Sequence, residues 1–341
     1  MIIRRLCLLL FSMAVIHGSA QVMNIHFKNG GSINYDTNSI DHIDFTLNED
    51  NPDNPPQETG ENVNKNTNGP MEAQTRLEFP HLKNGLVLVH YAELNKNTHQ
   101  TGVNYCVEWD TIASSQRWSC YQLYSSINYH SSYNVSRYYA SNDGTLSPTC
   151  QYPADPELPE KYQFSVDPYK YSGYDHGHIC PSADRLRSTD CNYQTFFITN
   201  MQPQYNKFNA GLWQEMESDV RNWVSMSDTL YVCKGGTIDN EEYILEYINQ
   251  SSHQRTRVNK EHIPVPRFFY MALLSRKGDT WQAMAYWAQN LNEDHSLDSR
   301  RGYAIKIDRL EELTGIDFFC NLPDDIETEV ESKLTLSYWF K

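Results

Sequence analysis

The sequence contains no CxxC pair of cysteines, which argues against a structural zinc site. It contains no internal repeat, which argues against a solenoid or a propeller. After residue 20 it has no apolar run long enough to cross a bilayer, so no membrane-spanning helix is expected there. What is present is a globular composition: 39% hydrophobic and 13% aromatic residues over 341 positions provide for a substantial core.

Positive charge is also in short supply. The chain has 28 Lys and Arg against 43 Asp and Glu, a formal net charge of −15. This is the wrong sign for a protein that holds nucleic acid by bulk electrostatics. A local cationic groove or a bound metal ion can still act where the overall field does not, so we expect any such binding to be weak and salt-sensitive.

The first 20 residues have the pattern of a cleaved secretory signal peptide. Arg4 and Arg5 give a positive start, residues 6–16 form a short apolar run, and small residues follow at 18–20. The apolar run is too short for a bilayer-spanning helix. We therefore expect a secreted protein, periplasmic or extracellular, after removal of the signal.

Seven of the eight cysteines remain after removal of this segment. An oxidising compartment permits disulfides, but an odd number leaves at least one thiol free or bonded to another chain. Cys180 and Cys191 flank the reactive side chains described below and are the first pair to test for a disulfide.

Composition divides the mature chain into three parts. Residues 21–47 alternate apolar and polar side chains around a turn at 29–31, which predicts a small β-rich unit: a hairpin and one more short strand. Residues 48–70 contain no aromatic residue and are rich in Asn, Pro and acidic side chains, so we interpret 48–74 as a disordered linker. Residues 75–341 then form the main domain.

The main domain has a mixed pattern of strands and helices. Strands are expected at 86–89, 105–109, 118–124, 195–199, 230–233 and 268–274. Helices are expected at 212–220, 310–313 and 325–334. This pattern predicts an α+β fold, in which helices are inserted between the strands of an antiparallel β-sheet core.

The densest group of reactive side chains lies at 174–187. Asp175, His176 and His178 occur together, and Gly177 permits an unusual backbone angle between the two histidines. A histidine near its usual pKa of about 6.5 is suited to act as a base at neutral pH. An exposed histidine-rich turn or an opportunistic metal site would have the same spacing, so this group alone does not decide the chemistry.

A second group lies at 199–217. Asn209 and Glu217 are eight residues apart, which on an α-helix is a rotation of about 80°, so both side chains can face one cleft. Their oxygens suit a hard, hydrated cation such as Mg²⁺. The alternatives are structural, since Asn209 is a favoured helix N-cap and Glu217 fits a solvated helix face equally well.

The two groups carry a motif in a fixed order. It consists of Asp-x-Gly-His, Pro-x-Ala-Asp, Asn-Met-x-Pro-Gln and Asn-x-x-x-Trp-x-x-x-Glu, at 175–178, 181–184, 200–204 and 209–217. This motif resembles that of the DNA/RNA non-specific endonuclease family, which has the ββα-metal (His-Me finger) fold. Segments at 105–109, 265–270 and 310–319 resemble other parts of the family, so the resemblance covers nearly all of 75–335.

The resemblance implies roles for individual residues. His178 would be the general base that takes a proton from the attacking water. Asn209 would be the direct protein ligand of Mg²⁺, with Mn²⁺ as the alternative, and Glu217 would hold the metal through a water. Asn200 would fix the position of the His178 loop. The reaction would be hydrolysis of phosphodiester bonds in DNA and RNA, leaving 5′-phosphate ends.

The resemblance also implies contacts with the substrate. The family uses an upstream arginine against the phosphate; Arg137 is the candidate here and Arg117 is its rival. Contacts with the substrate are further implied for His176, Arg185 and Gln204. The family motif usually has arginine where this chain has His176, so a positive charge is lost there or made pH-dependent.

Other functions are compatible with part of the pattern. A catalytically weak surface protein that binds nucleic acid or a protein partner would agree with the charge of −15 and with the N-terminal unit. A metal-storing or metal-sensing module would need more ligands in one shell than the sequence provides. The joint presence of His178, Asn209 and Glu217 favours the nuclease. The oligomeric state is open, with a homodimer as one option.

Overall fold

The computed structural model describes residues 22–26, 32–36, 61–95, 99–124, 135–142, 151–250, 252, 255–256 and 262–340. The chain divides into two units, residues 1–51 and residues 52–341. The expected signal peptide, the third short strand of the N-terminal unit and the first part of the expected linker lie outside the described residues.

The N-terminal unit contains the predicted hairpin. β1 (Val22–His26) and β2 (Ser32–Asp36) pair antiparallel. Val22 lies opposite Asp36, and His26 lies opposite Ser32. The alternating pattern therefore predicted both the strands and their pairing in this unit.

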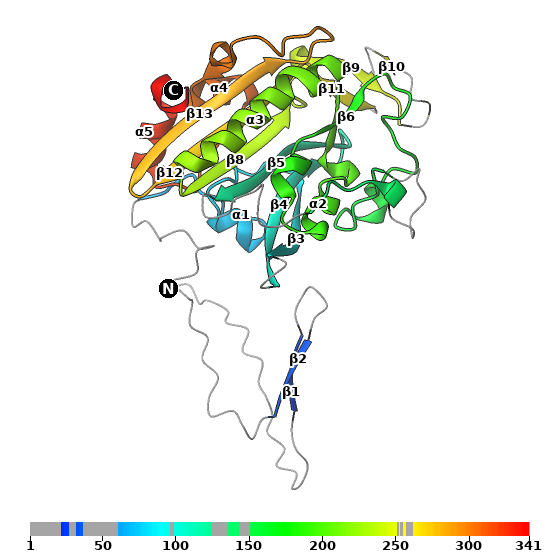
Figure 1. The fold of residues 1–341 in the computed structure, drawn as a ribbon, viewed down its shortest axis with the longest axis vertical. Helices are drawn as coiled ribbons and strands as arrows, with labels where there is room; N and C mark the ends of the chain where they lie inside the picture. The colour runs from blue at the N-terminus through cyan, green and yellow to red at the C-terminus, as the bar shows by residue number, and fades with distance from the viewer. Residues whose placement is uncertain are drawn as a thin grey trace. The chain divides into compact units, whose positions relative to one another are not determined.

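The main domain is built on a seven-stranded antiparallel sheet with the order β14-β13-β12-β8-β5-β4-β3 (Figure 1). Its strands are β3 (Leu86–Asn95), β4 (Gln100–Asp110), β5 (Ser115–Tyr124), β8 (Thr229–Gly236), β12 (Phe268–Lys277), β13 (Thr280–Gln289) and β14 (Ala304–Ile305). The predicted α+β class with an antiparallel core is confirmed.

The expected strand at 195–199 is wrong. This run follows α2 (Thr189–Gln194) and leads into a 3₁₀ turn at Ile198–Asn200. Phe196 is fully buried there, and a short apolar run has the same composition whether it forms a buried strand or a buried turn. β13 is a strand that the sequence patterns did not indicate, although it pairs with β12 along its whole length.

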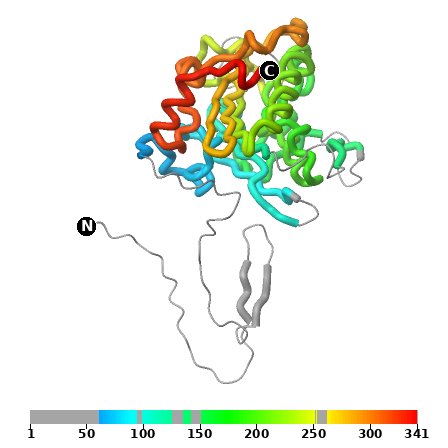
Figure 2. Tube along the Cα trace, turned by 60° about the vertical axis from the view of Figure 1, so that its left-hand side comes forward, coloured from blue at the N-terminus to red at the C-terminus, as the bar shows by residue number. Residues whose placement is uncertain are grey.

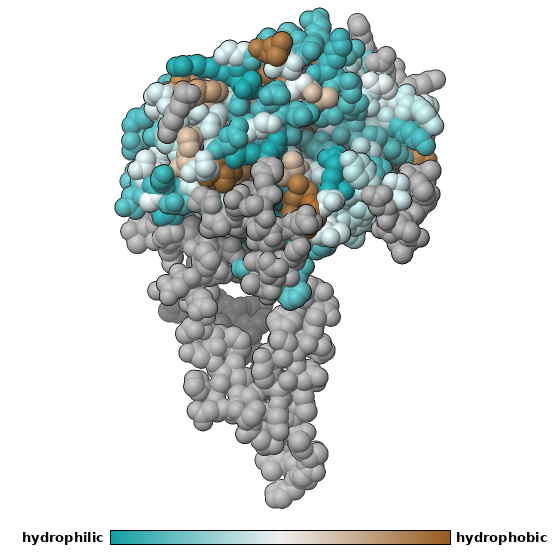
Figure 3. Space-filling view, viewed as in Figure 1, coloured by the Kyte–Doolittle hydropathy of each residue, from teal (hydrophilic) through white to brown (hydrophobic). Residues whose placement is uncertain are grey.

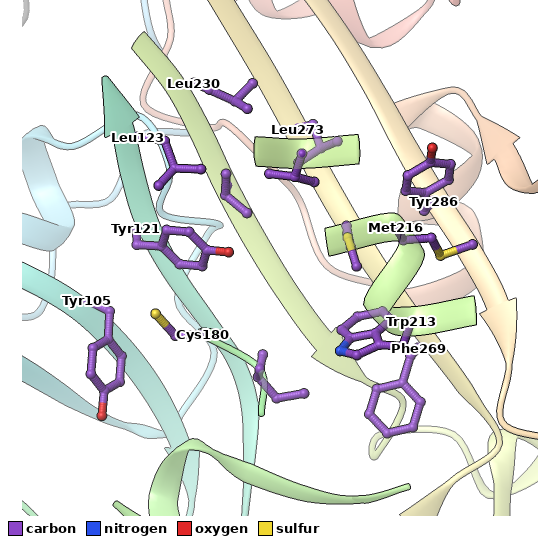
Figure 4. Close-up of a cluster of buried hydrophobic side chains, with 14 of the residues drawn as sticks. Tyr105, Tyr121, Leu123, Cys180, Trp213, Met216, Leu230, Phe269, Leu273 and Tyr286 are labelled. Atoms are coloured by element: carbon purple, nitrogen blue, oxygen red, sulfur yellow. The ribbon is translucent and has the colours of Figure 1, made fainter. Parts of the chain in front are cut away.

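One face of the sheet is covered by α3 (Gln214–Trp223), which lies across β8, β12 and β13 (Figure 1). Met216 and Val220 of this helix belong to one buried cluster with Leu273 and Tyr286 of the sheet. Figure 4 shows part of that cluster, with Met216 beside Tyr286. The buried residues recur at helical spacing, which is why this segment could be predicted as a helix.

The opposite face is covered by α4 (Ile307–Thr314) and α5 (Asp324–Glu331). Leu310 and Val330 of these helices form a second buried cluster with Leu274. Successive strand residues point to opposite faces of a sheet, so Leu274 and its neighbour in β12 belong to different clusters. Figure 2 shows α4 and α5 (orange to red) and α3 (green) on opposite sides of the strands. A short helix, α6 (Leu336–Trp339), ends the described chain.

Two smaller sheets complete the fold. One has the order β10-β9-β11, formed by β9 (Ile244–Ile248), β10 (Arg255–Thr256) and β11 (Ile263–Pro266). The other pairs β6 (Asp175–His178) with β7 (Met201–Gln204). Within the described ranges, no helix combines the length and the apolar character needed to cross a bilayer. On the face shown in Figure 3, hydrophobic residues are scattered among hydrophilic ones.

The end of the expected linker is folded onto the main domain. Residues 61–66, here called the N-terminal strap, use asparagine side chains to bond the C-terminal part of the chain. Asn62 Nδ2 donates to the Cys320 carbonyl at 3.0 Å, and Asn66 Nδ2 donates to the Pro80 carbonyl at 3.0 Å. α1 (Met71–Thr75) follows, with Ala73 buried. The linker prediction is therefore wrong from residue 61 onward, because a composition poor in apolar residues does not show which backbone groups its amides bond.

Candidate active site

The site is built on β6, β7 and the helical segment that follows them. His178 lies opposite Met201 in the β6–β7 pair. A Cβ atom at Gly177 would lie 2.3 Å from the Gln204 side chain, so no larger residue fits between the two histidines. Trp213 Nε1 donates to the His178 carbonyl at 3.2 Å, which ties the helical segment to β6. The predicted strand–strand–helix arrangement is thus present, and it forms one side of a cleft.

The cleft brings together residues from distant parts of the chain. It is lined, among others, by Arg137, Tyr152, His176, His178, Asn209, Glu217 and Arg221. The prediction that Asn209 and Glu217 face one cleft is therefore confirmed.

His178 has a neutral ring at neutral pH. Burial disfavours the charged imidazolium and the nearby Arg137 adds to the effect, which lowers the pKa of His178 to about 3. Phe196 packs against the ring edge-on, with the ring centroids 4.9 Å apart. Nε2 is buried and has no hydrogen-bond partner among the described residues. A neutral imidazole in a cleft has the chemistry of a proton acceptor.

Asn209 lies inside the π-helical segment Phe208–Trp213 and is not its N-cap. Its Nδ2 donates to Asp175 Oδ2 at 3.0 Å, and Asn206 Nδ2 donates to the same oxygen at 2.9 Å. These bonds fix the amide nitrogen of Asn209 on Asp175. The amide oxygen is then the group that Asn209 can present to a cation.

Glu217 is not on a solvated helix face. Its side chain is 12% exposed, and Oε1 accepts a hydrogen bond from Lys234 Nζ at 2.9 Å. Lys234 is fully buried on β8, with its ammonium 4.7 Å from the centre of the Trp213 ring. Burial raises the pKa of Glu217, and the positive charge of Lys234 opposes that rise.

Asn200 is fully buried behind the turn that follows His178. Its Oδ1 accepts from the Cys180 amide at 2.8 Å, and its Nδ2 donates to the Cys180 carbonyl at 2.8 Å. Both backbone polar groups of Cys180, in the peptide units before and after its Cα atom, are therefore held by one side chain. This geometry fixes the backbone two residues after His178.

A family model for DNA/RNA non-specific endonucleases matches residues 86–325, a range that contains all of these side chains. The chain belongs to this family. The family is described as that of the DNA/RNA non-specific endonucleases.

Curated relatives and solved structures agree with this assignment. A nuclease of Nostoc sp. is 33% identical over 171 residues, which cover 49% of this chain and 58% of the relative. Human mitochondrial endonuclease G is 23% identical over 180 residues, covering 51% of this chain and 57% of the relative. The chain thus spans less than two thirds of the length of both relatives.

The fold is similar to that of a chain in the crystal structure of the EndoG/EndoGI complex. The TM-score is 0.50 at 21% identity, over 64% of this chain and 84% of that chain. At this identity the likeness concerns the fold alone. It agrees with the ββα arrangement of β6, β7 and α3.

The structure separates the two candidate arginines of this family member. Arg137 lines the cleft, and its guanidinium lies 4.8 Å from the centre of the Phe196 ring. Arg117 is 6% exposed and forms ion pairs with Glu108 and Asp110, at 2.9 and 2.6 Å. A guanidinium held by buried and half-buried carboxylates is not available to a phosphate, so Arg117 is excluded as the rival.

The predicted substrate contacts of Arg185 and Gln204 are wrong, because both side chains are buried away from the cleft surface. Arg185 is 2% exposed; its guanidinium lies over the Tyr121 ring and donates to the Gln122 carbonyl at 3.2 Å. Gln204 is fully buried against Gly177. Neither side chain lines the cleft, since both are packed beneath it.

Arg221 is a cleft residue that the sequence analysis missed. Its Nη1 donates to Asp184 Oδ1 at 3.0 Å, and Asp184 also accepts from the Tyr121 hydroxyl at 2.8 Å. Arg221 follows Glu217 by four residues, which on a helix places both on one face. That spacing could have identified it.

The candidate disulfide between Cys180 and Cys191 is not formed. Cys180 and Cys191 are both buried free thiols, as are the other four cysteines in the described ranges. Cys150 lies outside the described residues. Positions that flank a motif in sequence need not face each other in space, and here Cys191 Sγ points at the Glu93 carbonyl, 3.3 Å away.

His176, the departure from the family motif, has its own partners. Its Nε2 lies 2.8 and 3.0 Å from the two carboxylate oxygens of Asp167. The ring stacks on Tyr152 with the centroids 3.7 Å apart and the planes 3° from parallel. The hydrogen bond and the charge of His176 lower the pKa of Asp167 against the effect of burial. A ring held on two sides is positioned at the cleft wall.

We expect the substitution His176→Arg to strengthen substrate binding at neutral pH. Arginine carries a permanent charge on a planar fork of donors, which can contact Asp167 and a phosphate together, whereas the imidazole ring has no such fork. The measurement is the KM for plasmid DNA at pH 7.5 and at pH 5.5. Tyr152→Phe is the control, because it changes a neighbouring cleft residue but keeps an aromatic ring stacked on residue 176. An unchanged or higher KM in the variant at pH 7.5 would contradict the prediction.

Proposed function

We propose that this endonuclease-family chain is a secreted, Mg²⁺-dependent enzyme that hydrolyses DNA and RNA with little sequence preference and leaves 5′-phosphate ends. One observation carries the proposal: a single cleft contains the neutral ring of His178 and the side chains of Asn209 and Glu217. A base beside oxygen ligands for a cation is the equipment for phosphodiester hydrolysis. The family model and the nuclease relatives support the reaction class.

His178 supplies the base. Because its pKa is lowered to about 3, the ring is neutral at pH 7 and can take a proton from water. The water oxygen then bonds to phosphorus while the bond from phosphorus to the 3′-oxygen breaks, which leaves the phosphate on the 5′ side. An anionic phosphate beside the ring stabilises the imidazolium, so the proton is held more firmly when substrate is bound.

The oxygens around Asn209 fit a hard divalent cation. Asp175 holds the amide nitrogen of Asn209, and the carboxylate of Glu217 lines the same cleft. Mg²⁺ binds through one or two such ligands and keeps several waters, and Mn²⁺ accepts similar oxygens. When bound, the cation would supply positive charge to the scissile phosphate and to the leaving 3′-oxygen.

Recognition of the phosphate backbone accounts for the low sequence preference. Arg137 is exposed at the cleft and presents a planar cation to a phosphate. Contacts with phosphate carry no base information, so DNA and RNA of any sequence satisfy them. The net charge of −15 then predicts weak, strongly salt-dependent binding.

Secretion is proposed from the sequence of residues 1–20. The free thiols are compatible with an oxidising compartment, because all six described cysteines are buried. The fold of the described residues does not depend on a disulfide among them.

The test is cleavage of supercoiled plasmid and of total RNA by the purified mature chain in Mg²⁺, in Mn²⁺ and in EDTA. Asn209→Ala is expected to lower the rate by about 100-fold or more, because it removes the proposed ligand. Asn206→Ala is the matched control, since Asn206 donates to the same Asp175 oxygen, at 2.9 Å.

Metal-dependent loss of both substrates, retained in Asn206→Ala and lost in Asn209→Ala, would establish the proposal. Equal losses in the two variants would show that Asn209 acts only by holding Asp175. Intact substrates under all conditions would favour a protein that binds nucleic acid or a partner without cleaving.

A further inference from the structure

Three carboxylates meet on the sheet face opposite to the cleft helix α3. They belong to Asp308 and Glu311 of α4 and to Glu331 of α5, and one oxygen of each lies within 4.8 Å of the other two. The hydrophobic sides of both helices are buried against the sheet. The carboxylates therefore lie where the two helices face each other.

Glu331 is the member of the group that needs a partner. It is 7% exposed, and within the described ranges its Oε1 is buried without any hydrogen-bond donor. Burying a carboxylate without a donor or a cation carries a large desolvation cost. The nearby Arg309 does not meet this need, because it pairs with Glu312 at 2.6 Å.

Glu311, the second carboxylate of the group, is held in place by the backbone. Its Oε1 accepts a hydrogen bond from the Phe318 amide at 2.7 Å, just beyond the turn that ends α4. The backbone therefore positions the Glu311 carboxylate beside the buried Glu331.

We propose that Asp308, Glu311 and Glu331 form a structural Ca²⁺ site that joins α4 to α5, separate from the cleft. Ca²⁺ binds oxygens at about 2.3–2.6 Å, so its ligand oxygens lie up to about 5 Å apart, and the spacing of the three carboxylates fits. Ca²⁺ takes six to eight oxygens and accepts bidentate carboxylates, whereas Mg²⁺ uses one or two carboxylates and keeps its waters. A set of three carboxylates at a half-buried helix interface therefore favours Ca²⁺.

The N-terminal strap is connected to this site. Asn64 Nδ2 donates to Glu327 Oε1 at 3.0 Å, and Glu327 precedes Glu331 by one helical turn. The same Nδ2 lies 3.2 Å from Asp317 Oδ2 in the loop after α4. A cation between α4 and α5 would thus stabilise the strap as well as the two helices.

The experiment is thermal unfolding of the mature chain carrying Asn209→Ala, so that any Ca²⁺ bound through the cleft ligand is removed from the result. Saturating Ca²⁺ is expected to raise Tm over EDTA by about 5–10 °C, and Mg²⁺ by less. Adding Glu331→Gln should abolish the rise. Glu329→Gln is the matched control on the same helix, because Glu329 is exposed and pairs with Lys333 at 2.7 Å.

The order of the unfolding temperatures of Glu331→Gln and its parent is expected to reverse between EDTA and Ca²⁺, and this test does not depend on activity. In EDTA, Glu331→Gln should unfold at a higher temperature than its parent, because one of three mutually repelling carboxylates is gone. In Ca²⁺ the order should reverse. Titration calorimetry with CaCl₂ should show one site in the Asn209→Ala chain and none after Glu331→Gln. A Tm independent of Ca²⁺, or a variant that is more stable in both conditions, would overturn the site and show that the carboxylates share protons instead.

Discussion

Replacement of His178 by alanine is expected to lower kcat by about 10²–10⁴-fold, which is the contribution of a positioned general base. The KM for plasmid DNA should change little, because the role proposed for the ring is proton transfer and not substrate binding. The measurement is steady-state cleavage at saturating Mg²⁺. His99→Ala is the matched control, since the His99 side chain is 82% exposed.

Imidazole in the buffer should restore part of the activity of His178→Ala and none of that of Asn209→Ala. Rescue by a free base shows that the missing function is proton acceptance. A decrease in kcat of less than tenfold in His178→Ala would contradict the assignment of His178 as the general base.

The pH profile provides a second test of His178. The pKa of the ring is about 3 in the folded free enzyme and about 6.5 in the unfolded chain. The ring therefore stays neutral through pH 5–8, and kcat/KM should show no acid limb near pH 6.5. A bound phosphate raises the pKa, so the acid limb of kcat should lie at higher pH than that of kcat/KM.

The lowered pKa of His178 also makes the free energy of unfolding depend on pH, in the direction opposite to that of a histidine in a salt bridge. Between about pH 6.5 and pH 3 the unfolded chain binds a proton at His178 that the folded chain does not bind. Acidification through this window therefore favours unfolding. The free energy of unfolding of His178→Ala should fall less than that of the wild type as the pH is lowered from 6 to 4, measured by urea denaturation at each pH. An unchanged pH dependence would contradict the lowered pKa.

Replacement of Lys234 by methionine is expected to reduce the free energy of unfolding by about 3 kcal/mol, the lower end of the cost of leaving one partner of a buried ion pair. The Lys234 side chain is fully buried and its ammonium lies 2.9 Å from Glu217 Oε1. Without that charge, burial would raise the pKa of Glu217 further, because less positive charge would oppose the desolvation of its carboxylate. Urea denaturation at pH 7.5 measures the stability, and the cleavage rate should fall with it.

The double variant Lys234→Met/Glu217→Gln separates the two causes. Removing both charges should recover most of the stability, because no carboxylate is then left unpaired, while the cleavage rate should stay low. Lys333→Met is the surface control and should leave stability unchanged, since Lys333 and Glu329 are both largely exposed. Strictly additive losses in the double variant would show that the pair is not coupled.

The sequence by itself determined the features that depend on local spacing. The alternation of β1 and β2, the apolar spacing of α3, and the order of His178, Asn209 and Glu217 all follow from residues close together in the chain. Strand and helix periods convert such spacing directly into a shared face. The α+β class and the family resemblance could therefore be predicted. The shared cleft of Asn209 and Glu217 was also predicted, although the chain between them is a π-helical segment with a kink at Gly211 and not the regular α-helix on which that prediction was based.

Local spacing failed where the partner lies far away in the chain. The composition of the N-terminal strap predicts disorder. The strap is nevertheless ordered, because its asparagines bond groups about 260 positions later in the chain, such as the Cys320 carbonyl, and local composition does not show these partners. The substrate contact of Arg185 rested on the family resemblance alone, which does not show whether a side chain is buried. Burial against Tyr121 could not be foreseen without the packing of β5.

Only the tertiary structure decided which charges act on which. It pairs Lys234 of β8 with Glu217 of α3, ties Arg221 to Asp184, and gathers carboxylates of α4 and α5 around the buried Glu331. The energy of a charge depends on its burial and on the few atoms within hydrogen-bond distance, and both are set by contacts between distant segments. The residue types at the site can thus be found from the sequence, whereas their protonation states follow from the fold.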